Sequence, residues 1–248
     1  MSNDVSIQIL GGGDAFGSGG NFQTSFYVSG RDFHFLVDCG ATALISMKRH
    51  FVAPELIDTI LLTHLHGDHF SGISFFLLDA QYVQQRKHPL HIVGPEGTEE
   101  KVFNALEIFY PGIEIEKFSY FIKFREYKSF ETFEAGPLQI TAFPVIHAPG
   151  AKPHGFRIKF EEKTLAFSGD TTWDDVLYKI AADSDLFMCE CNFYDTTNDN
   201  HLNYKQLQEK VIGLKCKQII LNHLGDEMLA NIEKVELPIA EDGKIFKV

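Results

Sequence analysis

The chain has 248 residues, 44% of which are hydrophobic, and it carries a formal net charge of −12 at pH 7. A chain of this length can bury a sizeable core, and we expect residues 1–248 to form a single domain. It contains no run of about eighteen apolar residues, so we expect no membrane-spanning helix. The negative charge, without any run rich in lysine or arginine, disfavours RNA as a partner.

The glycine-rich stretch 11–20 follows a strand that alternating apolar residues predict at 5–10. Its spacing is wrong for a dinucleotide-binding loop, because G-x-G-x-x-G starting at Gly11 needs glycine at position 16, where Phe16 stands. A phosphate-binding P-loop is excluded as well, since G-K-[ST] does not occur. The stretch is therefore a mobile loop that either passes close to a site or only turns the chain, and both readings stay open.

The rest of the first half alternates predicted strands and helices. The strands lie at residues 24–29, 34–38, 58–63 and 90–93, and the first two helices at 41–51 and 70–86. Thr98 is suited to cap a third helix, with Val102, Phe103, Leu106 and Phe109 on its buried face. From residue 113 to 141 the pattern is mainly strands, and we expect most of its many aromatic residues to pack in the core.

The second half repeats this organisation. Strands are predicted at 138–143, 155–160, 164–168, 186–190 and 218–222, and helices at 172–182 and 204–214. Asn203 and Gln206 resemble a capping box before the last helix. Two strand-rich blocks, each finished by helices, predict two sheets packed face to face with helices outside, an α/β fold that some schemes class as α+β.

The stretch from Thr63 to His69 reads Thr-His-Leu-His-Gly-Asp-His and connects a predicted strand to a predicted helix. Its side chains therefore converge at the edge of a sheet. Three imidazoles and one carboxylate within six residues suit a zinc-like divalent metal. A lone histidine is usually a packed or surface residue, but four donors at one turn indicate a metal site.

Three further donors, His147, Asp170 and His223, each follow a predicted strand. Strand ends and the loops beyond them are where open sheets collect functional side chains. With the first cluster they supply seven candidate ligands, enough for two metal ions that share a carboxylate. These ligands are His64, His66, Asp68, His69, His147, Asp170 and His223.

These seven residues, in this order along the chain, resemble the motifs of the metallo-β-lactamase superfamily of metal-dependent hydrolases. The resemblance implies a four-layer αββα sandwich with two divalent ions at one edge between the sheets, Zn²⁺ being expected and Mn²⁺ the alternative. By the family pattern, one ion is held by His64, His66 and His147, the other by Asp68, His69 and His223, and both by the bridging Asp170.

Within the superfamily the chain resembles the ribonuclease Z and phosphodiesterase branch. True β-lactamases commonly have cysteine where Asp170 stands, and flavodiiron oxidoreductases usually have glutamate in place of His66, so both activities are disfavoured. The stretches that carry the branch resemblance are His64–His69 with Gly72, Val93–Gly97, Gly155–Arg157, Phe167–Thr171 and Asp185–Glu190, followed by His201 ahead of a helix.

Two departures from that branch bear on the substrate. Bacterial-type ribonuclease Z carries a long tRNA-binding arm between the positions that match His147 and Asp170. Here these residues are only 23 positions apart, with one predicted pair of strands between them, so the arm is missing. Thr171-Thr-Trp173 also replaces that family's usual Thr-Arg-Pro. The cyclic phosphodiesterase of phosphonate metabolism lacks the arm too, but its cysteine-rich zinc site near the start does not occur here.

The resemblance implies a mechanism in which a metal-bound hydroxide attacks, because metal coordination lowers the pKa of water from about 15.7 towards 7. Asp68 would orient this nucleophile while binding its metal ion. His201, with Glu190 orienting it, would protonate the alkoxide leaving group. His154 lies near His147 in the sequence and is a further candidate for phosphate contact, although an ordinary loop role is preferred.

We therefore expect a phosphodiesterase that acts on a small, cyclic or single-stranded phosphodiester. The alternatives are a tRNA 3′-processing endonuclease with a non-standard recognition surface, a thioester or lactone hydrolase, and a non-catalytic metal-dependent sensor. A homodimer is compatible with the sequence. The sparse cysteines lack C-x-x-C spacing and are expected to be reduced, which is typical of a cytoplasmic protein: Cys39, Cys189, Cys191 and Cys216.

Overall fold

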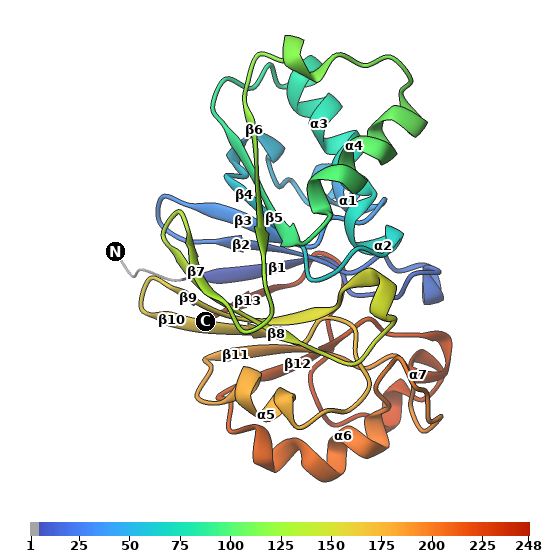
Figure 1. The fold of residues 1–248 in the computed structure, drawn as a ribbon. Coiled ribbons are helices and arrows are strands. Elements are labelled where there is room, and N and C mark those ends of the chain that lie inside the picture. Colours follow the sequence, from blue (N-terminus) through green and yellow to red (C-terminus); the bar gives the residue numbers. More distant parts are fainter. Residues whose placement is uncertain (1–4) are drawn as a thin grey trace.

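The computed structural model describes residues 5–248, and two β-sheets that pack face to face form its centre (Figure 1). The strands of the first sheet follow the order β13-β1-β2-β3-β4-β5-β6. They are β1 (Ser6–Gly11), β2 (Ser25–Ser29), β3 (His34–Val37), β4 (Thr59–Leu61), β5 (Leu90–Pro95), β6 (Ile122–Tyr127) and β13 (Ile245–Lys247).

The second sheet has the order β12-β11-β10-β9-β8-β7. Its strands are β7 (Thr132–Ala135), β8 (Leu138–Pro144), β9 (His154–Phe160), β10 (Lys163–Phe167), β11 (Leu186–Glu190) and β12 (Ile219–Asn222). The expected pair of strands between His147 and Asp170 is confirmed, because β9 and β10 pair antiparallel there.

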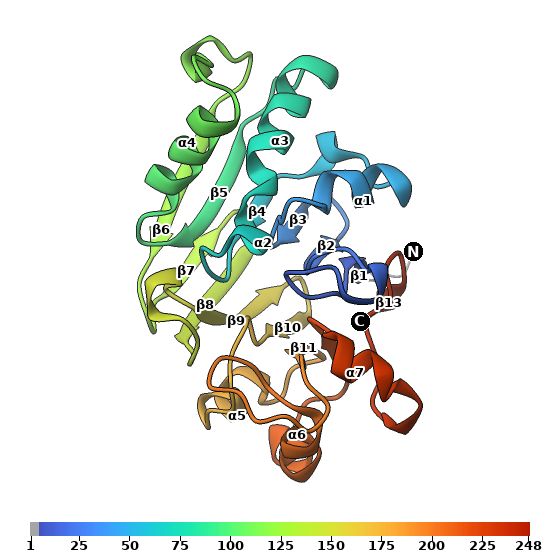
Figure 2. The ribbon, with the colours of Figure 1, turned by 90° about the vertical axis from the view of Figure 1, so that its right-hand side faces the viewer.

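Helices cover the outer face of each sheet (Figures 1 and 2). On the first sheet lie α1 (Ala43–Arg49), α2 (Gly67–Phe70), α3 (Gly72–Leu78) and α4 (Thr98–Phe109). On the second lie α5 (Val176–Ala181), α6 (Tyr204–Lys210) and α7 (Asp226–Ala230). This is the predicted αββα order of layers. Between Val5 and Val248, no helix has the length and apolar composition that a membrane span requires.

Three hydrophobic clusters fill the three spaces between these four layers. Side chains alternate along a strand, so each strand feeds two clusters. In β3, Phe35 and Val37 face the other sheet while Leu36 packs under the helices. In β11, Met188 faces the other sheet while Phe187 packs towards α5 and α6. Burial on both faces explains why these strands read as nearly continuous apolar runs.

Strand direction brings the candidate ligands to one edge. Neighbours from β3 to β6 run parallel, as do those from β10 to β12. Strands β8 and β10 both pair antiparallel with β9, so they point the same way. The carboxyl ends of β8, β10, β11 and β12 therefore lie together at one edge of the second sheet.

Several local expectations are wrong. Gly97, with a left-handed φ of 91°, precedes α4, whereas the Thr98 hydroxyl donates to the carbonyl oxygen of Pro95 (2.6 Å). Phe109, expected to be buried, is 46% exposed. Residues 113–121, expected in strands, include a short 3₁₀ helix (Ile115–Lys117) instead. The expected cap before α6 is confirmed by an N–H donation to the Asn203 side chain.

Candidate metal centre

The seven predicted donors lie together where the carboxyl ends of the strands meet. The structure groups them in two sets whose ligand atoms lie within 4.8 Å of one another in each set. One set comes from the loops after β4 and β8, and the other from α2 and from the loops after β10 and β12. The first set is His64, His66 and His147, and the second is Asp68, His69, Asp170 and His223.

One oxygen of Asp170 lies between the two sets. Its Oδ2 is 3.2 Å from Nε2 of His69, 3.3 Å from Nε2 of His223 and 3.7 Å from Nε2 of His64. The Nε2 of His147 lies 4.0 Å away. In a tetrahedral zinc site with ligands at about 2.0–2.2 Å, neighbouring ligand atoms are about 3.3–3.6 Å apart. These separations fit two ions that share Asp170.

Asp38 organises the side of the cluster that comes from the first sheet. Its Oδ2 accepts a hydrogen bond from Nδ1 of His69 (2.8 Å) and another from the Thr63 hydroxyl (2.8 Å). Because Thr63 gives its proton to Asp38, its oxygen is left to accept from Nδ1 of His64 (3.0 Å). Both imidazoles therefore carry a proton on Nδ1, and Nε2 of each ring is directed at the cluster.

The histidines from the second sheet are oriented in the same manner. Nδ1 of His147 donates to the carbonyl oxygen of Asn200 (2.8 Å). The Thr24 hydroxyl donates to the carbonyl oxygen of Gly13 and so accepts from Nδ1 of His223 (3.0 Å). Nε2 is again the nitrogen that each ring directs at the cluster: that of His223 lies 3.3 Å from Oδ2 of Asp170, and that of His147 lies 3.0 Å from Nδ1 of His66. Such outward hydrogen bonds are a regular feature of metal-binding histidines.

The donor set suits divalent cations. Nε2 of His64 is buried and makes no hydrogen bond, whereas the buried Nε2 of His69 lies 3.1 Å from Oδ2 of Asp68 and 3.2 Å from Oδ2 of Asp170. Burial alone would lower the pKa of His69, but the charges of Asp170, Asp68 and Asp38 raise it well above its ordinary value, so a bound metal ion would displace a proton from this ring. Burial lowers the pKa of His64 well below its ordinary value and that of His223 to about 4, so both rings are neutral, the form that binds a metal. Burial alone would raise the pKa of Asp170, but the nearby imidazoles of His223 and His69 hold it well below its usual range. Buried imidazole nitrogens gathered around a charged carboxylate favour the binding of a cation.

Two glycines let the ligand loop approach the turn that follows β3. A Cβ on Gly40 would lie 1.9 Å from the carbonyl oxygen of Asp68, and one on Gly72 would lie 2.0 Å from the carbonyl oxygen of Gly40. The close approach lets the N–H of Cys39 donate to the carbonyl oxygen of His69 (2.7 Å). This packing holds α2, with Asp68 and His69, against the end of β3.

His201 and Glu190 form a pair beside the cluster. Glu190 ends β11, is fully buried, and its Oε1 accepts from Nδ1 of His201 (2.8 Å). The same carboxylate accepts the backbone N–H of Thr171, Asn192 and Leu202. The His201 ring lies 4.9 Å from the His147 ring, measured between centroids.

The charge of Glu190 keeps a proton on His201. Burial alone would lower the pKa of His201, but its hydrogen bond to Glu190 and that residue's charge raise the pKa to about 9. His201 is therefore protonated at neutral pH, with its Nδ1 occupied by Glu190, whose own pKa is raised by burial to about 7. The proton on Nε2 is the one available to a bound molecule.

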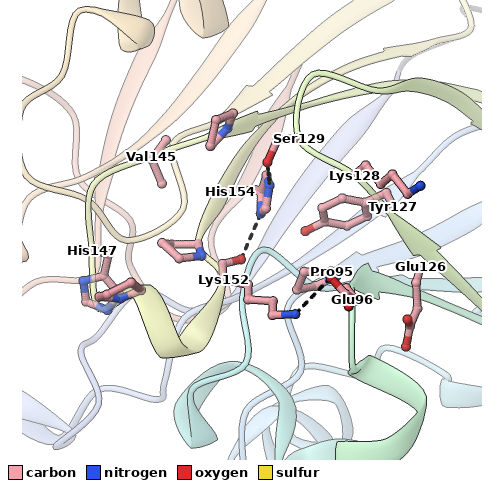
Figure 3. A pocket seen from close by; sticks show the side chains of 13 residues that line it. Pro95, Glu96, Glu126, Tyr127, Lys128, Ser129, Val145, His147, Lys152 and His154 are labelled. Atoms are coloured by element: carbon pink, nitrogen blue, oxygen red, sulfur yellow. Dashed lines mark hydrogen bonds and ion pairs between the residues drawn. The ribbon is translucent and has the colours of Figure 1, made fainter.

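Two cavities with no lining residue in common reach the centre. The first, of about 540 Å³, has His147 at one end and is lined by Lys128 and Lys152 among others; we call it the His147-side cavity (Figure 3). The second, of about 560 Å³, is lined by His201 and His223 among others; we call it the His201-side cavity. Both volumes are typical of small-molecule sites.

His154 lies in the wall of the His147-side cavity, but its ring is fully engaged. Nδ1 donates to the carbonyl oxygen of Lys152 (2.9 Å), and Nε2 accepts from the hydroxyl of Ser129 (2.9 Å), as Figure 3 shows. Neither nitrogen is left for a phosphate. His154 therefore holds the loop before β9 against the loop after β6.

Sequence reasoning missed the residues that orient the ligands. Asp38 has no place among the residues that the sequence predicts for the site, although it anchors both His64 and His69. The available signal was an acid directly after the apolar strand Phe35–Val37. Thr24 and Asn200 carry no comparable signal, because their roles depend on contacts across 199 and 53 residues of chain.

Comparisons with known proteins agree with this site. The family model of the anti-Pycsar protein Apyc1 matches residues 5–246. The probable metallo-hydrolase YhfI of Bacillus subtilis (strain 168) is 25% identical over 228 residues, which cover 89% of this chain and 87% of that protein. The anti-Pycsar protein Apyc1 of Paenibacillus sp. (strain J14) is 26% identical over 232 residues, covering 90% and 91%.

Ribonuclease Z of Mycobacterium bovis (strain BCG / Pasteur 1173P2) is 28% identical over 193 residues, which cover 74% of this chain and 69% of that protein. The crystal structure of YhfI from Bacillus subtilis superposes with a TM-score of 0.80 at 22% identity, covering 99% of this chain and all of the other. The fold, the donor cluster and these matches make the chain a metal-dependent hydrolase. It belongs to the family of the anti-Pycsar protein Apyc1, within the metallo-β-lactamase superfamily.

Proposed function

We propose that this hydrolase is a phosphodiesterase for a small cyclic phosphodiester, with a 3′,5′-cyclic nucleotide as the substrate class. The observation that carries the proposal is the His201–Glu190 pair beside the metal cluster. Hydrolysis of a phosphodiester expels an alkoxide, which needs a proton at neutral pH. An imidazolium held by a buried carboxylate supplies that proton from a set position.

The seven donors named above are proposed to hold two divalent ions, with Asp170 between them. When bound, such ions neutralise charge on phosphoryl oxygens and lower the pKa of water. Asp68 is the more accessible carboxylate, since its side chain is 11% exposed and that of Asp170 only 3%. Asp68 is therefore suited to accept a hydrogen bond from the attacking water and to orient it.

In the proposed reaction a bond forms between the water oxygen and phosphorus, and the bond from phosphorus to a ribose oxygen breaks. His201 donates its Nε2 proton to that ribose oxygen. Glu190 keeps the ring in place and stabilises its positive charge until the transfer. Of the two protons that the attacking water loses, one returns to His201 and the other is released to solvent, so the product is a nucleoside monophosphate that carries the second phosphate charge.

A small substrate is favoured over a long RNA. The two cavities each have a volume near 550 Å³, the size of a small ligand. The chain carries a net charge of −12, which repels a polyanion. The ribonuclease Z relative nevertheless bears a nuclease name, so precursor tRNA belongs in the test.

The test is a substrate panel with the metal-loaded protein. The panel contains 3′,5′-cyclic nucleotides, bis(p-nitrophenyl) phosphate, a precursor tRNA, a thioester and a lactone. We expect the cyclic nucleotides to have the highest kcat/KM, with a nucleoside monophosphate as product. Preferential cleavage of precursor tRNA, of the thioester or of the lactone would replace the proposal by that activity, and no hydrolysis of any member would favour a sensor.

A further inference from the structure

The position of the proton donor determines where the rest of the substrate lies. In an in-line displacement the leaving oxygen departs opposite the attacking water, and the donor must reach it. In a cyclic nucleotide the leaving oxygen belongs to the ribose, so ribose and base lie on the side of His201. The His201-side cavity is therefore the space that receives the nucleoside, whereas the His147-side cavity contacts the centre only through His147.

The lining of the His201-side cavity suits an uncharged group. It includes the acids Asp14, Asp226 and Glu227, and no lysine or arginine lines it within the residues that the structure describes. A second phosphate or a polynucleotide chain would be repelled by these carboxylates. A sugar and a base are uncharged, so these carboxylates would not repel them.

Phe16 presents a free aromatic ring in this lining. It contributes to the cavity and is nonetheless 93% exposed. The loop around it is tightly held, because the buried carboxylate of Asp14 accepts the N–H of Phe16 (3.1 Å), the N–H of Ser18 (3.0 Å) and the Ser18 hydroxyl (2.8 Å). The Gln23 side chain also donates to the carbonyl oxygen of Ala15 (3.1 Å).

The loop is further supported by α7, which it lies beside in Figure 2. A Cβ on Gly19 would lie 2.7 Å from a methyl carbon of Leu229, so the loop touches the helix closely. Gly17, directly after Phe16, has a left-handed φ of 71°, which glycine adopts without strain. A fixed backbone with an exposed ring loses little entropy when a ligand covers that ring.

We propose that Phe16 is the stacking surface for the nucleobase of the substrate and that the His201-side cavity is the nucleoside subsite. The inference rests on the proposed function, since it names the part of a cyclic nucleotide beyond the phosphate. It also assigns a role to the glycine-rich loop, for which the dinucleotide and P-loop readings failed. Every base has an aromatic face, so this contact favours nucleotides without selecting strongly among them.

The test compares a 3′,5′-cyclic nucleotide with ribose 3,5-cyclic phosphate, which lacks the base. The proteins are wild type, Phe16→Ala, Phe16→Trp and the control Phe51→Ala, which removes another phenylalanine that is 96% exposed but lines neither cavity. We expect Phe16→Ala to raise KM for the nucleotide by about 5- to 150-fold, the range for loss of one stacked base. Its kcat, its metal content and its activity on the base-free substrate should stay within about twofold.

Phe16→Trp should restore the wild-type KM for the nucleotide, and Phe51→Ala should leave the KM for both substrates unchanged. An equal loss of activity on both substrates in Phe16→Ala, or an unchanged KM for the nucleotide, would refute the nucleoside subsite. Neither result would contradict the proposed phosphodiesterase activity. If wild type cleaves no cyclic nucleotide, the proposed function fails instead. In that case the subsite is tested by calorimetry with a nucleoside 5′-monophosphate and with ribose 5-phosphate. Phe16→Ala must weaken binding of the nucleotide and leave binding of ribose 5-phosphate unchanged. Equal affinity of wild type and Phe16→Ala for the nucleotide refutes the subsite.

Discussion

The two cavities at the metal centre have similar volumes but different chemistry. The His147-side cavity includes Lys128 and Lys152, the latter paired with Glu96 (3.1 Å), and its histidine His154 has both nitrogens engaged. The His201-side cavity has acids, an exposed aromatic ring and a histidine whose Nε2 is free to donate. Volume alone does not distinguish them, whereas the location of a transferable proton does.

The difference teaches that, where two cavities border one metal centre, the position of the proton donor determines which cavity receives the leaving part of the substrate. Both cavities border the same donor cluster, but among the described residues only the His201-side cavity is lined by a histidine that is placed to donate a proton to a leaving group. The following variants test this asymmetry, beginning with the largest expected effect.

His201→Ala should lower kcat on a cyclic nucleotide by about 10²- to 10⁴-fold, because the leaving oxygen loses its proton donor. Metal content, measured by elemental analysis, should stay the same, since Nδ1 of His201 is engaged by Glu190. The matched control is His154→Ala, which removes the histidine of the other cavity and should change kcat by less than about threefold. Loss of metal from His201→Ala would make this residue a ligand, which its proximity to His147 and Asp170 also permits.

Glu190→Gln should lower kcat by about 10- to 100-fold while the metal stays bound, because a neutral amide stabilises the imidazolium of His201 poorly. Its single acceptor oxygen also cannot serve all the N–H groups that the carboxylate now satisfies, so Tm should fall by about 2–12 °C. Asp185→Asn is the control. That carboxylate accepts the N–H of Thr164 beside the other end of β11, and kcat should not change. A wild-type kcat in Glu190→Gln would show that Glu190 serves the fold alone.

Asp38→Asn tests how strongly the centre binds metal, independently of the two cavities. The change weakens the hydrogen bonds that orient His64 and His69, so metal affinity should fall by about 10- to 100-fold in a competition titration with a chelating dye. At saturating metal, kcat should recover to near the wild-type value. Asp58→Asn, which alters a carboxylate that accepts the N–H of His34 away from the centre, should keep wild-type affinity. Equal affinities in both variants would refute the orienting role of Asp38.

Lys128→Ala combined with Lys152→Ala should have the smallest effect, a change of less than about threefold in kcat/KM for a cyclic nucleotide. These lysines line the His147-side cavity, whereas the nucleoside is assigned to the His201-side cavity and the single phosphate to the metal ions. The salt dependence of kcat/KM should likewise match wild type. A loss of tenfold or more, with a weaker salt dependence, would indicate that the lysines bind phosphates and would favour an RNA substrate.

Much of the fold was readable from local patterns. Strands such as β11 were predicted with the observed bounds, because side chains that are buried on both faces leave a continuous apolar run. The same local reasoning failed at α4, where Gly97 takes the cap position expected of Thr98. It also failed at residues 113–121, whose aromatic residues suggested strands. In both places tertiary packing overrode a local preference.

The sequence by itself determined the seven candidate ligands and their order, because metal-binding donors cluster at strand ends and those ends are visible as breaks in apolar runs. It also pointed to the pair His201 and Glu190 through a family resemblance. Only the tertiary structure decided which nitrogen of His69 and of His223 is directed at the cluster, because that depends on partners such as Asp38 and Thr24 from other parts of the chain.

Which residues line the two cavities was likewise determined by the tertiary structure alone. The His201-side cavity joins Phe16 to His201 and Asp226, residues separated by about 200 positions of chain. No periodicity or spacing links such residues, since their contact arises only when the two sheets pack and bring the loops of both to one edge.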